Sequence, residues 1–288
     1  MGYRSILVPL EESNSLDSVL TLTLMIARQF QSHIEGFCIR PSLAGAIAVG
    51  FEGGVAALAG TEEQFEIEQG TRSERLKEQF DKFIKENNLK NSQPNENNEL
   101  TVSWNENEAS GIGLFGQRGR VFDLIVVGRP TPGALTPAMN TLETVLFESG
   151  RPVLIAPPTI SQKIIDHIAI AWNGSTETAR TIAFAMPLIK NAKHISILNI
   201  EGAMVPGPTA VEVANSLTRQ DITVDIINRE GKRSPSDAGA LMLNETENIG
   251  ANLLIKGGYT QSRLRQMIFG GATNHILNEA KMPVLMAH

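Results

Sequence analysis

The sequence predicts an α/β protein built from two similar domains, each with a mostly parallel β-sheet. Apolar runs of strand length alternate along the chain with longer stretches of helical periodicity, and this order favours right-handed crossovers between parallel strands. The order of elements in the first half recurs in the second half. Its period is far longer than the ~20 to 50 residues of a solenoid repeat, which indicates a duplicated domain.

The first half opens on a strand followed by a helix. Ser5 to Leu10 is a buried-strand run, and the helical pattern of Leu16 to Phe30 follows it, with Ser13 and Asn14 as capping candidates and Asp17 in the first turn. The later elements of this half are expected to be a strand, a polar helix and another strand, over Ile34–Ile39, Glu62–Asn87 and Leu100–Trp104. The tract Ala44–Gly60 is apolar but too rich in glycine for a helix, and we expect a flap there.

The second half repeats this order. The expected elements are a strand, a helix, a strand, a helix, a strand and a helix, over His167–Trp172, Thr176–Lys190, His194–Ile200, Thr209–Thr218, Thr223–Asn228 and from Pro235 onward. The ends of the halves also match, since Asp123–Gly128 parallels Asn252–Gly257 and Arg151–Ile155 parallels Met282–Met286. We therefore expect one domain over residues 1–158 and a second over 163–288, joined near Pro157.

Composition excludes several classes of function. The 288 residues are 42% hydrophobic, enough to bury two cores, and the net charge of -6 argues against a nucleic-acid or anionic-membrane surface. The single cysteine, Cys38, allows no disulfide or cysteine-based metal site, and the five histidines lack metal-ligand spacing. The chain has no signal-peptide pattern and no apolar run near the ~20 residues of a membrane span. A cytoplasmic location is expected.

The segment Ala251–His288 holds the strongest candidate for a binding site. A strand-like run ends at the glycine pair Gly257 and Gly258, and the last helix opens at a second pair, Gly270 and Gly271. The loop between the pairs carries two arginines, Arg263 and Arg265, and no acidic residue. A helix N-terminus exposes unpaired N–H groups at the positive end of its dipole, and glycine lets a phosphate approach the backbone. The sequence therefore indicates an anion site.

Other nucleotide and hydrolase motifs are weak or missing. Gly111, Gly113 and Gly116 form a GxGxxG match, but it does not directly follow a strand, so glycine in an ordinary helix or loop is the favoured interpretation. The sequence has no GxxxxGK[ST] and no GxSxG motif, which argues against a P-loop nucleotidase and a serine hydrolase.

Together these features resemble a tandem universal stress protein of the UspA type. The resemblance rests on the duplicated units and on the two glycine pairs, Ala272, Thr273 and the ending Pro283–Leu285, and it covers the chain except for Ala44–Gly60 and Asn91–Asn98. It implies two tandem Rossmann-like domains of the adenine nucleotide α-hydrolase-like type. Each would hold a mostly parallel five-stranded sheet flanked by helices, and a pseudo-twofold axis would relate the two.

The resemblance also implies a nucleotide site in the second domain. Nucleotide-binding members carry glycine, two residues, glycine, nine residues, glycine, then serine or threonine. Those four positions are Gly257, Thr260, Gly270 and Gly271 here. Thr260 departs from the pattern because it replaces the second glycine, and Gly271 departs because it replaces the serine or threonine. The implied ligand is ATP with Mg²⁺, with the phosphates held by Gly257, Thr260, Arg263, Gly270, Gly271 and Thr273, and the base by Asn173 and Ile200.

The first domain departs further from the family pattern. Its loop Arg129–Ala134 contains prolines, and Asn140 and Thr141 stand where paired glycines would open the last helix. Prolines remove N–H donors, so we do not expect nucleotide binding there. Glu11 is the residue that matches Asn173. The resemblance further implies that Val153–Ile155 pairs with Val284–Met286 within the chain as an intramolecular pseudo-dimer, and it leaves a homodimer of whole chains open.

The expected function is that of a stress-response regulatory protein. Nucleotide occupancy would change the affinity of this protein for an unidentified protein partner. Neither a nucleic acid nor a membrane is expected as a ligand. Catalysis is not expected, because the glycine-flanked loop offers no general base. The alternative is a non-nucleotide small-molecule or protein-interaction stress protein that has lost ATP binding, in which Ala44–Gly60 would line an apolar pocket.

Overall fold

A computed structural model describes residues 2–41, 43, 62–94, 99–108, 111, 113–131, 136–160, 165–201, 204–230, 235–258 and 271–288. The chain divides into two compact units. The N-terminal unit comprises residues 2–127 and 133–151, and the C-terminal unit comprises residues 128–132 and 152–288. None of the helices in the described ranges is long and apolar enough to cross a membrane.

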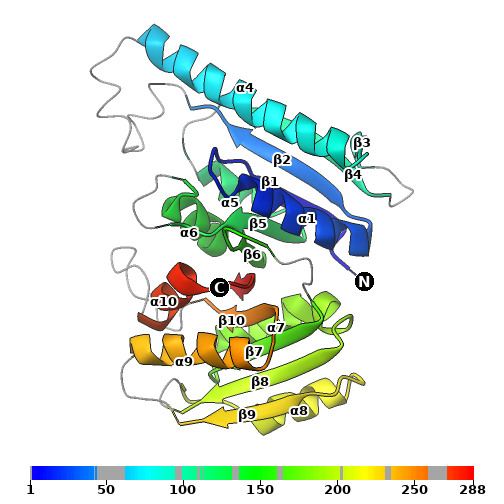
Figure 1. Ribbon diagram of the computed structural model, residues 1–288, viewed down its shortest axis with the longest axis vertical. Coiled ribbons are helices and arrows are strands. Elements are labelled where there is room, and N and C mark those ends of the chain that lie inside the picture. The colour runs from blue at the N-terminus through cyan, green and yellow to red at the C-terminus, as the bar shows by residue number, and fades with distance from the viewer. Residues whose placement is uncertain are drawn as a thin grey trace. The chain divides into compact units, whose positions relative to one another are not determined.

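The N-terminal unit contains a parallel sheet in the strand order β3-β4-β2-β1-β5 (Figure 1). Its strands are β1 Ser5–Pro9, β2 His33–Ile39, β3 Lys90–Asn91, β4 Thr101–Asn107 and β5 Leu124–Gly128. Its helices are α1 Leu16–Phe30, α4 Glu62–Glu86, α5 Gly113–Gly119 and α6 Met139–Glu148. The two-residue strand β3 was not expected from the sequence, because two exposed polar residues carry no strand pattern.

Helix α1 has the expected bounds but begins differently from the expectation. Its N-cap residue is Ser15, and no side chain caps it, so the capping role expected of Ser13 and Asn14 is wrong. Asp17 does lie in the first turn, where a negative charge favours the helix dipole. The helix is held mainly by its apolar face, along which Leu16, Val19, Leu20, Leu22 and Leu24 are buried.

The GxGxxG match proves to lie largely on a short helix. Gly113 begins α5, and a Cβ on Gly116 would lie 2.8 Å from the Glu148 Cβ and 3.0 Å from the Thr144 oxygen of α6. The glycine at this position therefore allows α5 and α6 to pack closely. This packing agrees with the interpretation favoured from the sequence.

The C-terminal unit contains the strand order β6-β11-β10-β7-β8-β9. Its strands are β6 Val153–Ala156, β7 His167–Trp172, β8 His194–Ile200, β9 Asp225–Arg229, β10 Leu253–Gly257 and β11 Val284–Ala287. Its helices are α7 Thr176–Ile189, α8 Ala210–Thr218, α9 Pro235–Asn248 and α10 Gly271–Glu279. Strands β7 to β11 are parallel. Strand β6 pairs antiparallel with β11, with Leu154 beside Leu285, and this confirms the expected pairing.

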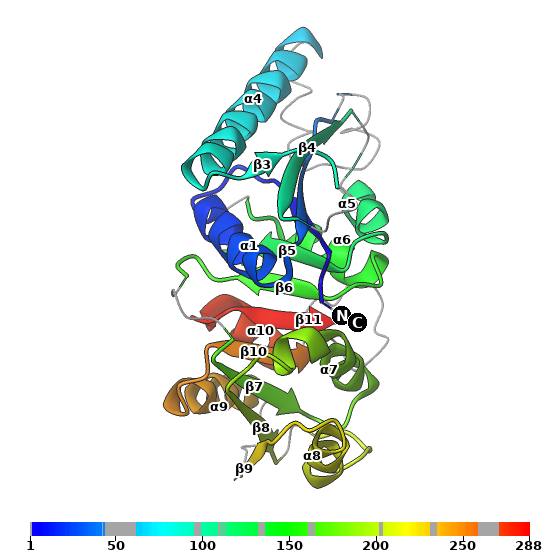
Figure 2. The same ribbon diagram turned by 90° about the vertical axis from the view of Figure 1, so that its right-hand side faces the viewer.

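Two neighbouring strands of this unit send the chain to opposite faces of the sheet. Figure 2 shows α7 and α8 along one face and α9 and α10 along the other. Strand β7 leads into α7 and its neighbour β10 leads towards α10. Such a topological switch point leaves a crevice at the carboxyl ends of the two strands, which is where open α/β sheets bind ligands.

Replacement of Ser175 by alanine should weaken the start of α7. Ser175 is the N-cap residue, and its hydroxyl accepts a hydrogen bond from the backbone N–H of Thr178. Loss of such a cap costs about 1 kcal/mol, whereas glycine at the same position costs only a few tenths. Urea unfolding of Ser175→Ala and Ser175→Gly would measure both. Equal losses would show that the hydroxyl contributes little.

Candidate functional site

The carboxyl ends of β7 and β10 are joined by a short chain of hydrogen bonds. The backbone N–H of Gly257 donates to Thr178 Oγ1 over 3.2 Å, and that hydroxyl donates to Asn173 Oδ1 over 2.7 Å. Oδ1 also accepts from the Ser175 backbone N–H at 3.2 Å. Asn173 and Gly257, which the sequence analysis assigned to opposite ends of one ligand, therefore lie at one edge of the sheet. Among the described residues, none accepts a hydrogen bond from Asn173 Nδ2.

Two glycines at this edge are required by close approach of the backbone. A Cβ on Gly257 would lie 2.5 Å from the Thr178 backbone nitrogen, because the end of β10 packs directly on the first turn of α7. Gly174 has φ +84, and a Cβ there would lie 2.6 Å from the carbonyl oxygen of Val205. The segment after β8 folds over this turn, since the Val205 N–H also donates to the Asn173 carbonyl at 2.8 Å.

The N-terminus of α10 lies beside a buried lysine on β10. Lys256 is only 8% exposed, and its Nζ donates to the Gly257 carbonyl over 2.8 Å and to Thr273 Oγ1 over 3.0 Å. Gly271 and Thr273 lie in the first turn of α10, where the backbone N–H groups lack helical partners. Alternation along the strand points Gly257 towards α7 and Lys256 towards α10. An amine is therefore held against the positive end of a helix.

The charge of Lys256 has no counter-charge in the part of the chain that the structure describes. No carboxylate there lies within ion-pair distance of Nζ, and burial lowers the pKa of the amine to about 8. An ammonium group has three donors, and two of them are used by Gly257 and Thr273. A buried and unpaired cation is costly unless an anion joins it. The arrangement favours an anion at the start of α10.

Sequence reasoning missed Lys256, although a signal was present. It is the one charged residue in the apolar strand Leu253–Gly257, and Val127 occupies the matching position of the first half. A lysine inside a fully buried strand is rare unless it is paired or functional. The same contrast between the halves could have identified it before the structure.

Ile200, expected at the base, ends β8 with its side chain buried. The register places Trp172 of β7 beside Asn199 of β8, so Asn173 and Ile200 follow at the same edge. A cavity of about 510 Å³ opens beside them at the ends of β8 and β9, between Asn199, Met204 and Asn228. Asn199 donates from Nδ2 to Asn228, and its buried Oδ1 has no partner among the described residues. This unpaired oxygen is buried and is therefore shielded from the cavity.

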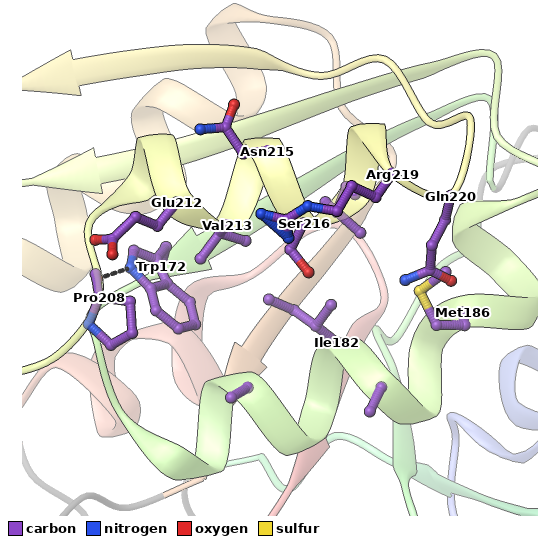
Figure 3. A pocket seen from close by; sticks show the side chains of 13 residues that line it. Trp172, Ile182, Met186, Pro208, Glu212, Val213, Asn215, Ser216, Arg219 and Gln220 are labelled. Carbon is purple, nitrogen blue, oxygen red and sulfur yellow. Dashed lines mark hydrogen bonds between the residues drawn. The ribbon is translucent and has the colours of Figure 1, made fainter.

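A second hollow of this unit is a groove of about 590 Å³ between α7 and α8, lined by apolar and polar side chains. Figure 3 shows Trp172 and Pro208 at one end, Ile182 on its floor and Met186 near the other end. The Trp172 indole N–H donates to the Pro208 carbonyl at 2.9 Å, so the ring lies fixed in the wall. None of the expected site residues lines this groove.

Several expected features lie outside the described residues. These are Thr260, Arg263 and Gly270 of the nucleotide loop and the glycine-rich tract 44–60. Of the eight expected site residues, the structure therefore places Asn173, Ile200, Gly257, Gly271 and Thr273. The hydrogen bonds link Asn173 with Gly257 through Thr178, and Lys256 with Thr273. Within the described residues, no group of three or more His, Cys, Asp or Glu could hold a metal ion.

The matching edge of the N-terminal unit is arranged differently. Glu11, which follows β1 as Asn173 follows β7, extends to the N-terminus of α6. Its carboxylate accepts a hydrogen bond from Thr141 Oγ1 at 3.0 Å and from the Ala138 backbone N–H at 3.3 Å to each oxygen. The side chain is only 9% exposed, and burial raises its pKa to about 7 against weaker opposing effects of these bonds and of Arg72. A protein carboxylate thus occupies the helix N-terminus.

Comparison with known proteins identifies the fold. No family model and no curated protein matches the sequence. A universal stress protein from Archaeoglobus fulgidus has a similar structure, with a TM-score of 0.68 and 14% identity over 98% of this chain and 97% of that chain. A protein of unknown function from Pseudomonas aeruginosa has a TM-score of 0.51 and 14% identity over 99% of this chain and 92% of that chain. Over nearly its whole length, the chain has the fold of a universal stress protein.

Proposed function

We propose that the chain is a universal stress protein that binds ATP, with Mg²⁺, in its C-terminal unit and regulates an unidentified protein partner through occupancy of that site. The buried, uncompensated Lys256 beside the first turn of α10 carries this proposal. Its side chain and the helix dipole would act on the same anion.

The phosphates would lie at the N-terminus of α10. The N–H groups of its first turn, the third donor of Lys256 and the hydroxyl of Thr273 converge there. Thr273 accepts from Lys256, so its own proton stays available to a phosphate oxygen. Thr260, Arg263 and Gly270 would complete the site. The need for glycine at position 257 is explained by the close packing of β10 on α7. Gly257 would therefore shape the end of the strand and need not donate a hydrogen bond to the phosphates.

The base would lie at the ends of β7 and β8. Asn173 Nδ2 can donate to a ring nitrogen such as those of adenine. Ile200 would supply its backbone at the same edge. This arrangement supports a purine ligand that extends from the ends of β7 and β8 to the start of α10.

We propose binding without turnover. Hydrolysis needs a general base within hydrogen-bond reach of the attacking water. None of the expected site residues is Asp, Glu or His, and Lys256 is held by Gly257 and Thr273. The protein would therefore respond to nucleotide occupancy rather than consume it.

The test is to purify the protein without added nucleotide, denature it and assay the supernatant for adenine nucleotides, with a thermal-shift titration of MgATP alongside. At a hundred times Kd, ATP should add about 2.7 kcal/mol of stability. Each kcal/mol should raise the midpoint by roughly 2 °C or more in a chain of this size. Released ATP, or a saturable shift that Gly270→Asp abolishes, is the expected result. The absence of both would overturn the proposal.

The groove between α7 and α8 favours one second candidate, an apolar small molecule in place of a nucleotide. Its lining includes Trp172, Ile182 and Met186, whose side chains suit an apolar body. Native mass spectrometry of the freshly purified chain would decide between them. A bound mass other than a nucleotide, lost on Ile182→Gln, would support this candidate, and the bare chain mass or a nucleotide adduct would count against it.

A further inference from the structure

We propose that the outer side of β9 is a docking surface for a second copy of this chain, which sets its own β9 antiparallel to the first about a twofold axis at Ile227. Strand β9, Asp225–Arg229, is the last strand of its sheet, and no strand in the described ranges pairs with its outer side (Figure 1). We call this side the β9 edge. A strand edge of this kind presents unpaired N–H and C=O groups and acts as a template for another strand.

The hydrogen bonds to β8 show which backbone groups of β9 face outward. The Arg229 carbonyl accepts from the Glu201 N–H over 2.9 Å, so the backbone groups of Arg229 point to β8. In a parallel ladder the N–H and C=O of one residue point to the same neighbour, and those of the next residue point away from it. Ile227 therefore also bonds to β8, whereas Ile226 and Asn228 direct their backbone groups to the β9 edge.

One antiparallel register uses all of these outward groups. With Ile227 opposite Ile227 of the second copy, Ile226 lies opposite Asn228, and such a pair exchanges both of its N–H···O bonds. The twofold axis repeats the pair on its other side. The Asn228 carbonyl accepts from Arg229 Nη1 at 3.0 Å within the chain, and its second lone pair remains for the second copy. A slip by one residue would set outward groups against inward ones.

The side chains of this register are complementary in charge. Asp225 of each copy lies opposite Arg229 of the other, and opposite charges directly across a strand pair stabilise it. Arg229 uses Nε for Glu245 and Nη1 for the Asn228 carbonyl, so within the described part of the chain Nη2 remains for the Asp225 carboxylate of the second copy. An unrelated peptide carries no such symmetric pattern, which favours a second copy as the occupant.

The outer edge of the N-terminal unit's sheet offers no comparable template. Strand β3, Lys90–Asn91, has only two residues, both exposed, and Lys90 pairs with Glu99. A very short edge strand that carries lysine is protected against pairing with other chains. Strand β9 has five residues and contains neither lysine nor proline. The chain therefore protects the first edge and leaves the second open to a partner strand.

The first test places a cysteine at the proposed twofold axis. Two residues opposite each other without mutual hydrogen bonds have Cα atoms about 4.5 Å apart, within the range of roughly 4.4 to 6.8 Å that a disulfide spans. Ile227→Cys should therefore link two chains under mild oxidation, measured as a doubled mass on a non-reducing gel. The natural Cys38 is buried and should not compete.

Ile226→Cys is the matched control for this linkage. In the proposed register the two copies of residue 226 lie diagonally across the strand pair, about 7 to 8 Å apart, which is too far for a disulfide. This variant should stay unlinked under the same oxidation. Equal linkage of both variants, or linkage of neither, would overturn the proposal.

The second test exchanges charges across the strand pair. Asp225→Arg sets two arginines against each other, and Arg229→Asp sets two carboxylates against each other, so each variant alone should associate roughly tenfold more weakly than the natural protein. An equimolar mixture should recover the association, because both cross-strand pairs are then attractive. Sedimentation velocity would measure it. A mixture no better than its components, or a natural protein that is monomeric at every concentration, would contradict the proposal.

A third variant decides the matter even if Arg229→Asp does not fold without its Glu245 pair. Ile226→Pro removes an outward N–H that β8 does not use, and edge strands tolerate proline where the N–H faces solvent. Ile226→Val keeps the N–H and is the matched control. Both should fold, and only Ile226→Pro should associate more weakly in sedimentation. Equal association of the two would show that the β9 edge is not the interface.

Discussion

Lys256→Met should stabilise the protein at neutral pH and at the same time weaken its binding of nucleotide. Burial lowers the pKa of Lys256 from its ordinary 10.5 to about 8. That difference corresponds to about 3 kcal/mol against the charged form in the folded state. Methionine fills a similar volume without charge but leaves the Gly257 carbonyl and the Thr273 hydroxyl without a donor. Each of these two buried acceptors costs about 1 kcal/mol or more when unpaired, so the net gain in the free energy of unfolding should be at most about 1 kcal/mol.

The stability advantage of Lys256→Met should depend on pH. Between about pH 8 and pH 10.5 the unfolded chain keeps the lysine proton that the folded chain has lost, so the stability of the natural protein rises with pH. The advantage of Lys256→Met should be largest below pH 8 and shrink above it. Urea unfolding at about pH 7 and about pH 10.5 would measure this. The exposed Lys190→Met serves as the control and should change little.

The same variant should bind MgATP at least about tenfold more weakly, because a hydrogen bond to a charged group contributes about 1.5 to 3 kcal/mol. A residue that lowers stability and raises affinity is typical of a functional site. If Lys256→Met gained stability and kept its affinity, the lysine would have no part in phosphate binding. The anion site would then rest on the backbone alone.

Gly257→Ala should destabilise the protein severely. Its Cβ would meet the Thr178 backbone nitrogen at 2.5 Å and the Glu177 carbonyl carbon at 2.9 Å, and both are main-chain atoms that cannot move without displacing α7. Overpacking of a core by one group usually costs 1 to 3 kcal/mol, and contact with backbone belongs at the upper end, so we expect about 3 kcal/mol or more. Thermal and urea unfolding would measure the loss.

Gly70→Ala is the matched control for this substitution. Gly70 lies inside α4, and a Cβ there would meet nothing within 4 Å. Alanine is favoured over glycine in a helix interior by about 1 kcal/mol, so this variant should be stabilised. If both variants changed stability equally, the close approach of β10 and α7 would be wrong.

Much of the fold follows from sequence periodicity. The duplicated order of strands and helices and the bounds of α1 and β8 were predicted, because buried strands and amphipathic helices carry strong local patterns. The pairing of β6 with β11 was expected from the family resemblance alone, and its antiparallel direction was not predicted. The strand β3 and the cap of α1 were missed. Both depend on tertiary placement. The exposed Lys90 and Asn91 pair with β4 only because the preceding helix α4 ends beside that edge of the sheet.

The site was less accessible to sequence reasoning. The family pattern directed attention to glycines and hydroxyls, and it had no position for a lysine in the preceding strand. Lys256 matters because Thr273, many residues further along the chain, returns to the same place. The reach of Glu11 to Thr141 is likewise a long-range contact that no local spacing reveals. Hydrogen bonds between distant segments determine the site, whereas local patterns determine the elements.

The partnership of β6 with β11 has a consequence for synthesis of the chain. Strand β6 leaves the ribosome about 130 residues before β11, its antiparallel partner. At 5–20 residues per second, that edge of β6 waits for roughly 6 to 26 seconds. An unpaired strand edge of Val, Leu and Ile invites pairing with other nascent chains. We expect ribosome-bound chains that end just before β11 to depend on a holding chaperone, and full-length chains to be released from it.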